Sequence, residues 1–246
     1  SNDWVTSCDF GKPTHNHLPN TNTGSSFLHK PENTVSFNAQ GGVSYRVFPV
    51  PFESPNHGGD ALVIDPANQD ASPFGWHDTN GAPGPEYTIT RGNNVIARDD
   101  IDNNNTGGLS PDGGSSLTFD FPFNFEVSPE VMLPAVTTNL FYWNNIMHDV
   151  NYQYGFDEAS GNFQENNYGN GGTGTDFVDA QAQDGGGTNN ANFSSPPDGN
   201  NPRMQMYLWD GPPGNALTID GSLAGNYLGV SAAFGGSLPE DIPLVG

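Results

Sequence analysis

Glycine and proline interrupt this chain so often that long regular elements are excluded over most of its length. The 246 residues include 32 glycines and 21 prolines, above the usual share of globular proteins. Glycine readily adopts positive φ, and proline fixes φ and lacks a backbone donor. The chain is therefore expected to form short elements joined by many turns and loops.

Residues 128–154 depart from this pattern and predict one long amphipathic helix. Ser128, Pro129 and Glu130 supply an N-cap, a first-turn proline and a first-turn acid. Gly155 is placed to end the helix. Apolar residues recur between these limits at helical spacing, namely Val136, Leu140, Trp143, Met147 and Val150.

Short strands are expected before and after this helix. Residues 43–50 and 61–64 are apolar runs bounded by turn residues, and residues 204–209 form a similar run near the end. Residues 117–127 alternate apolar and polar positions, which predicts a half-buried strand made irregular by Pro122. The expected fold is α+β: a β-rich N-terminal lobe, one long amphipathic helix and an Asn/Gly-rich region.

The charge balance excludes several classes of partner. The chain has 6 Lys and Arg against 28 Asp and Glu, a net charge of -22, so neither nucleic acid nor an anionic membrane surface is an expected partner. Membrane insertion is not expected, because no stretch approaches the roughly 18 apolar residues of a span. Cys8 is the single cysteine, which excludes an intrachain disulfide framework. These features suit a secreted, extracellular protein.

Metal-binding patterns are few. No His-Glu-x-x-His occurs, and the close pair His15 and His17 lies in a polar terminal stretch where a native metal role is not expected. Asp100, Asp102 and Asn104 gather oxygen ligands in one loop, so calcium is a candidate ligand there. The competing interpretation is an acidic solvated turn, because the spacing does not fit an EF-hand.

His148 and Asp149 are adjacent on the predicted helix. They could form a general base with an orienting acid. A histidine satisfied within the helix packing is the commoner arrangement and is favoured here. Since a serine nucleophile motif is also absent from the sequence, the residues alone give no complete catalytic set.

An ordered series of sequence blocks resembles the fungalysin family of zinc metallopeptidases. The resemblance covers about residues 40–221, and its blocks are residues 45–49, 71–77, 90–95, 138–149, 154–164, 174–178, 182–185, 187–193, 196–199 and 203–209. It implies a thermolysin-like arrangement, in which an edge strand of a β-rich lobe binds the substrate backbone opposite a zinc-bearing lobe. Strand addition of this kind gives affinity through backbone hydrogen bonds.

The family's Asn-Asn-Ala-x-Phe segment falls on residues 189–193. The resemblance therefore implies that Asn190 and Ala191 contact the substrate. The alternative is that these residues only form a tight turn before the strand that begins at Met204.

The sequence departs from the family where the zinc helix is expected. Residues 229–240 instead resemble members in which a protease-associated domain is inserted. We therefore expect a polar N-terminal extension (1–40), the N-terminal lobe of the catalytic domain (41–221) and a linker into an inserted domain (222–246). No catalytic residue is expected in this span, and the zinc ligands and general-base glutamate are expected downstream of Gly246.

Three functions remain open, of which a carbohydrate-binding surface ranks last because the Trp and Tyr residues do not group on one face in the sequence. The first is the non-zinc-binding part of a secreted zinc metalloendopeptidase that acts on peptides or proteins. The second is a noncatalytic extracellular assembly or binding module that reuses this scaffold and self-associates through exposed strand edges.

Overall fold

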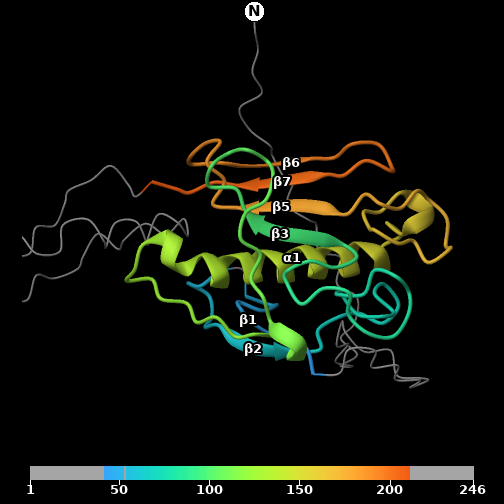
Figure 1. Ribbon diagram of the computed structural model, residues 1–246, viewed down its shortest axis with the longest axis horizontal. Coiled ribbons are helices and arrows are strands. Elements are labelled where there is room, and N and C mark those ends of the chain that lie inside the picture. The colour runs from blue at the N-terminus through green and yellow to red at the C-terminus, as the bar shows by residue number, and fades with distance from the viewer. Residues whose placement is uncertain (1–41, 53, 211–246) are drawn as a thin grey trace, which may run out of the picture. The chain divides into compact units, whose positions relative to one another are not determined.

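The computed structural model describes residues 42–52 and 54–210, which form two sheets and one long helix (Figure 1). The sheets have the strand orders β2-β1-β4 and β3-β5-β7-β6. The strands are β1 (Ser44–Val47), β2 (Ala61–Ile64), β3 (Val95–Asp99), β4 (Thr118–Phe119), β5 (Val178–Ala182), β6 (Ala191–Ser194) and β7 (Arg203–Met206). The helices are α1 (Leu133–Gln153) and the 3-10 turns η1 (Gly114–Ser116), η2 (Pro129–Met132) and η3 (Glu158–Ser160).

Several expectations fall outside the described residues. These are the N-terminal extension 1–40 with Cys8, His15 and His17, the end of the 41–221 lobe, and the linker 222–246. Within the described part of the chain, no helix is long and apolar enough to cross a membrane.

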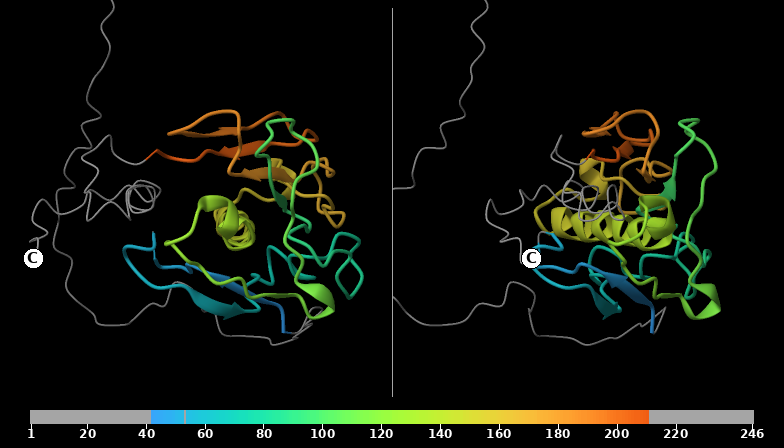
Figure 2. Two further views of the ribbon diagram at one scale, coloured as in Figure 1. Left: turned by 60° about the vertical axis from the view of Figure 1, so that its left-hand side comes forward. Right: turned by 90° about the vertical axis from the view of Figure 1, so that its left-hand side faces the viewer.

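Helix α1 lies between the two sheets (Figure 2). It packs on β1 from one side and on β3 and β5 from the other. In the larger sheet β3, β5 and β7 are parallel, and β6 runs antiparallel to β7. In the smaller sheet β1 pairs antiparallel with β2 and parallel with β4. This mixture of sheets and one long helix confirms the α+β class.

An aromatic cluster fills the space between α1 and the smaller sheet. The fully buried Tyr45 ring lies 5.3 Å from the Phe119 ring and 5.4 Å from the Trp76 ring. Phe141 of α1 and His77 join the cluster, with His77 stacked on Phe119 at 5.3 Å. Each such ring pair adds about 0.5–1.5 kcal/mol beyond area burial, so this cluster holds α1 against β1.

The apolar stripe that predicts α1 lies on a less buried flank of the helix. Met147 and Val150 are exposed, while Thr137, Asn145 and Asp149 are buried. The helix therefore turns a partly polar face into the protein, and its length and ends agree with the predicted range to within a few residues.

The strand predicted over residues 117–127 is wrong for most of its length. Only Thr118–Phe119 pairs with a neighbour, as β4. Beyond it Pro122 offers no backbone donor, and the side chains are held instead by ring contacts. Phe48 lies 4.6 Å from Phe123 and 6.2 Å from Phe125. Alternating burial therefore persists here without a strand.

Candidate functional site

Strand β6 is the outermost strand of the larger sheet, and no strand of the described residues pairs with its outer side. It pairs with β7 on one side, and all four of its residues are exposed. The pairing places Ala191 opposite Met206 and Phe193 opposite Met204. An open strand edge presents unpaired backbone N–H and C=O groups, which are a template for adding another strand.

Hydrogen-bond alternation identifies which residues face the open side. The backbone N–H of Tyr207 donates to the Asn190 carbonyl at 3.3 Å. In an antiparallel pair, alternate residues bond to the partner, so Asn192 and Ser194 point their backbone groups toward β7. Ala191 and Phe193 therefore direct their N–H and C=O groups outward.

The Asn190 side chain stands beside this open edge. Its Oδ1 accepts a hydrogen bond from the Ala191 N–H at 2.8 Å, and its Nδ2 has no partner among the described residues. Asn190 thus offers an exposed amide donor next to the outward-facing Ala191 carbonyl, a pair of groups that can bind one peptide unit of an extended chain.

The opposite edge of the same sheet is covered. Thr90 and Ala97 exchange two hydrogen bonds, since the Ala97 N–H donates to the Thr90 carbonyl at 2.8 Å and Thr90 Oγ1 donates to the Ala97 carbonyl at 2.7 Å. The Asp99 N–H donates to the Leu109 carbonyl at 3.2 Å. Covering loops thus protect β3 from pairing, whereas β6 has no such cover among the described residues.

Two hydrogen bonds that involve aspartates anchor the loop that joins β6 to β7. Asp176, fully buried, accepts from the Gly199 N–H at 2.9 Å, and burial raises the pKa of its carboxyl. Asp198 accepts from the Thr173 N–H at 3.0 Å. The hairpin that carries the open edge is therefore fixed at its far end.

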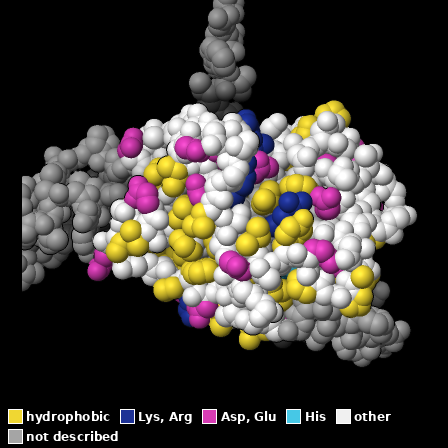
Figure 3. Space-filling view, in the orientation of Figure 1, with side chains coloured by type: hydrophobic (Ala, Val, Ile, Leu, Met, Phe, Trp, Pro, Cys, Tyr) yellow, Lys and Arg dark blue, Asp and Glu magenta, His cyan; other side chains and the backbone are white. Residues whose placement is uncertain are grey.

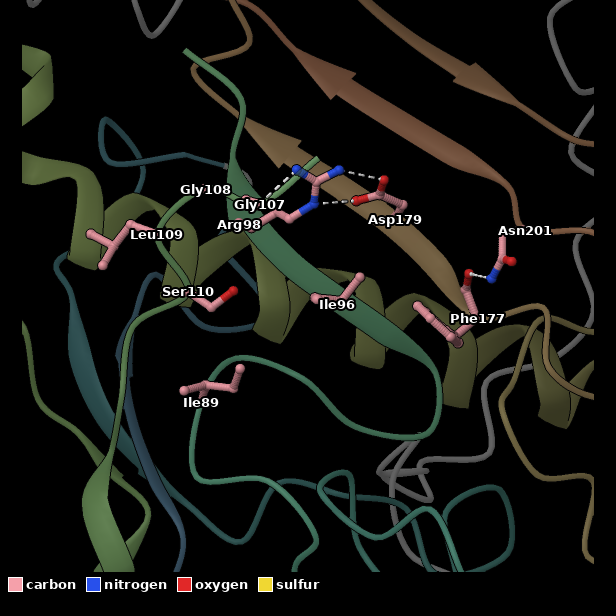
Figure 4. A pocket seen from close by; sticks show the side chains of 10 residues that line it. All are labelled: Ile89, Ile96, Arg98, Gly107, Gly108, Leu109, Ser110, Phe177, Asp179 and Asn201. Carbon is pink, nitrogen blue, oxygen red and sulfur yellow. Dashed lines mark hydrogen bonds and ion pairs between the residues drawn. The ribbon is translucent and has the colours of Figure 1, made fainter. Parts of the chain in front are cut away.

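A cleft of about 700 Å³ opens on the larger sheet at the β3 edge, away from β6 (Figure 4). Its lining is mainly apolar, with Ile89, Ile96 and Phe177 among its side chains. Arg98 donates to both carboxylate oxygens of Asp179, at 3.0 and 2.7 Å, and to two backbone carbonyls. Because this guanidinium is already satisfied, the cleft shows no group arranged for chemistry.

Asp149 is the centre of a buried polar cluster. Its Oδ2 accepts from the Asn68 N–H and from Trp76 Nε1, both at 2.9 Å. Its Oδ1 accepts from Ser72 Oγ at 2.8 Å and lies 3.0 Å from His148 Nδ1. The other ring nitrogen of His148 lies 2.8 Å from Gln164 Oε1. His148 is therefore a satisfied histidine in the helix packing, which is the favoured sequence interpretation.

The candidate calcium residues lie in the loop after β3. Asp100 is buried, and its carboxylate accepts from the N–H groups of Asn104 and Asn105 at 3.1 and 2.9 Å. Asp102 Oδ2 accepts from Asn104 Nδ2 at 2.6 Å. These side chains are thus occupied in shaping the loop, and calcium binding here stays a prediction.

Residues 42–52 and 54–210 contain no group of three or more His, Cys, Asp or Glu side chains placed to hold a metal. The donor set of a zinc site is not present in this part of the chain.

Acidic side chains are scattered over the face shown in Figure 3, with Lys and Arg at few points. The arginines of the described residues are engaged: Arg46 with Asp60 and Asp120, Arg91 with Glu165, Arg98 with Asp179, and Arg203 with Asn105. Such a surface does not favour a polyanionic partner.

Sequence reasoning did not find the Asp149 cluster or the covering of β3. Both join segments far apart in the chain, such as Trp76 to Asp149, and no local spacing signals them. The prediction that Asn190 and Ala191 lie at an edge strand rests on the family resemblance.

The fungalysin metallopeptidase family matches residues 44–227 of this chain. Extracellular metalloproteinase 2 of Arthroderma benhamiae is 44% identical over 172 residues, which cover 67% of this chain and 26% of that protein. Extracellular metalloproteinase 5 of Trichophyton tonsurans is 42% identical over 172 residues, covering 68% of this chain and 27% of that protein. The chain therefore spans about a quarter of the length of these relatives. Since one family matches residues 44–227, which is most of its length, this chain belongs to the fungalysin metallopeptidases.

Proposed function

We propose that this chain is the substrate-binding, non-zinc-binding part of a secreted zinc metalloendopeptidase. A peptide substrate adds to β6 as a further strand, with Ala191 and Phe193 bonding to its backbone and Asn190 donating from its side-chain amide. The zinc ligands and the general base belong to parts of the protein outside this span. The extracellular names of the relatives support secretion.

The observation that carries this proposal is the contrast between the two edges of one sheet. The β3 edge is covered by its own loops, whereas nothing within residues 42–52 and 54–210 pairs with the outer side of β6, whose four residues are all exposed. Natural sheets usually blunt an edge that has no use. Backbone pairing at such an edge binds extended chains with little demand on their sequence, which suits an endopeptidase.

The test is the variant Ala191→Pro in the intact protein, assayed on a denatured, fluorescently labelled protein substrate. Proline removes the N–H that donates to Asn190 Oδ1, which frees the Asn190 side chain, and it places its ring at the open side without removing a bond to β7. We expect kcat/KM to fall about tenfold or more, because the steric block and the loss of the bond that holds the Asn190 amide beside the edge together exceed about 1.4 kcal/mol.

Ala191→Ser is the matched control, since it keeps the N–H and adds one atom. It should retain kcat/KM within about twofold. Unchanged kcat/KM in Ala191→Pro, with the thermal midpoint preserved, would refute substrate binding along β6.

The noncatalytic alternative rests on the same edge, because an open strand can also pair with a second copy of the chain. Intact-mass measurement and peptide mapping of the native protein separate the two. Peptides that contain a His-Glu-x-x-His sequence would support the peptidase. A native protein without them, forming multimers that Ala191→Pro disrupts, would support assembly.

A further inference from the structure

Asn189 and Asp210 form a reciprocal clamp at the start of β6. Asn189 Nδ2 donates to Asp210 Oδ2 at 2.7 Å, and the Asp210 N–H donates to Asn189 Oδ1 at 2.7 Å. A third bond joins the same places, because the Asn189 N–H donates to the Leu208 carbonyl at 2.8 Å. The two segments are thus tied together just before the exposed Ala191.

The backbone changes direction at this clamp. Asn189 has a φ of 59°, in the left-handed region that asparagine tolerates better than most residues. Its N–H and the carbonyl of the next residue, Asn190, both bond toward the segment that continues β7. Two consecutive residues of a regular antiparallel strand do not both do this. The left-handed residue therefore breaks the alternation.

This break decides which residues of β6 face outward. If regular alternation continued from the bond at Asn189, then Ala191 and Phe193 would turn their backbone groups toward β7. The observed bond from Tyr207 to the Asn190 carbonyl sets the opposite phase, in which those two residues face the open side.

We propose that Asn189 and Asp210 are positioning residues that hold β6 in the phase presenting Ala191 and Phe193 to the substrate. This inference rests on the proposed binding of substrate along β6. Neither clamp residue needs to touch the substrate. Their side chains fix the left-handed turn, and the turn fixes the pattern of outward donors and acceptors.

The test compares three variants of the intact protein on the same labelled protein substrate. Asp210→Ala removes one clamp bond, and KM should rise about twofold to threefold. Asn189→Gly removes both side-chain bonds while tolerating positive φ, and KM should rise about threefold to tenfold. Asn189→Ala adds backbone strain and should have the largest effect. In all three kcat should stay within about twofold, since the reacting groups are elsewhere.

Asp65 supplies the matched control in the other sheet. It too has positive φ, at 46°, and its Oδ1 accepts from the N–H groups of Gly42 and Val43 at 3.1 Å. Asp65→Ala should lower the thermal midpoint without changing KM. Hydrogen exchange on the intact protein adds a direct readout, because loosening of the clamp should speed exchange in residues 190–194 of Asn189→Gly but not of Asp65→Ala.

The outcomes separate this inference from the proposed function. If Ala191→Pro lowers kcat/KM while Asn189→Gly leaves KM and exchange in residues 190–194 unchanged, the clamp has no positioning role and substrate binding along β6 stands. If Ala191→Pro has no effect, both proposals fall together. A KM increase in Asp65→Ala equal to that of Asn189→Gly would also overturn the clamp, because general destabilisation would then explain it.

Discussion

Removal of the Asp149 carboxylate should cost more stability than any other single polar change in α1. Asp149 is 4% exposed and accepts from the Asn68 N–H, Ser72 Oγ and Trp76 Nε1, with His148 Nδ1 at 3.0 Å. In Asp149→Ala these donors lose their acceptor inside the protein. Breaking a buried charged network by removing one member costs about 3–5 kcal/mol.

Asp149→Asn should be milder, at about 2–3 kcal/mol. The amide oxygen can keep the two N–H donors, from Asn68 and Trp76, while the amide nitrogen turns toward Ser72. That hydroxyl can rotate to accept, which leaves the bond to His148 as the main loss.

Urea unfolding of the intact protein, followed by tryptophan fluorescence, measures both variants. Trp76 donates directly to Asp149, so its emission should shift in both variants even before unfolding. Asp70→Ala is the control, because this exposed acid lies in the loop that also carries Asn68 and Ser72. It should change stability by less than about 0.5 kcal/mol. A loss below about 1 kcal/mol in Asp149→Ala would refute the view that this cluster holds α1 in place.

Three further predictions concern the framework around the site. Burial lowers the pKa of His77 from 6.5 to about 4, so as pH falls the unfolded chain binds a proton before the folded chain does. Urea unfolding should therefore show that the free energy of unfolding falls by about 3 kcal/mol between pH 6.5 and 4, a loss that is absent in His77→Gln. Gly92→Ala would place a Cβ against the Trp76 carbonyl oxygen, whereas the Cβ of Gly59→Ala meets no atom within 4 Å. Thermal melts should show that Gly92→Ala loses about 2 kcal/mol or more of stability and that Gly59→Ala loses almost none. Arg98→Lys replaces the bidentate ion pair with Asp179 and two hydrogen bonds to backbone carbonyls with a single ammonium group. Urea unfolding should show that the free energy of unfolding falls by about 2–4 kcal/mol.

The sequence predicts the elements better than it predicts their faces. The 3.6-residue period identifies α1, yet the stripe that reveals it includes the exposed Met147 and Val150. The buried face carries Asn145 and Asp149 because distant segments supply their partners. Asn94 Nδ2, for example, donates to Asn145 Oδ1 at 3.0 Å. Hydrophobic periodicity cannot register a core contact made by polar groups.

The candidate site shows a similar limit. Strand β6 has four residues, all exposed, so its short Ala-Asn-Phe-Ser alternation does not correspond to a buried face and is too brief to mark a strand. The family resemblance locates Asn190 and Ala191, but the phase of the edge depends on the left-handed Asn189 and its bonds to Asp210. Those bonds join residues 21 apart and appear only in the folded chain.

A structure of the intact protein with a non-cleavable extended peptide bound tests the central claim most directly. The account predicts that the peptide lies along β6 as an added strand, with its backbone hydrogen-bonded to Ala191 and Phe193 and one carbonyl close to Asn190 Nδ2. A peptide bound elsewhere, with the outward groups of β6 paired to another part of the protein, would contradict it.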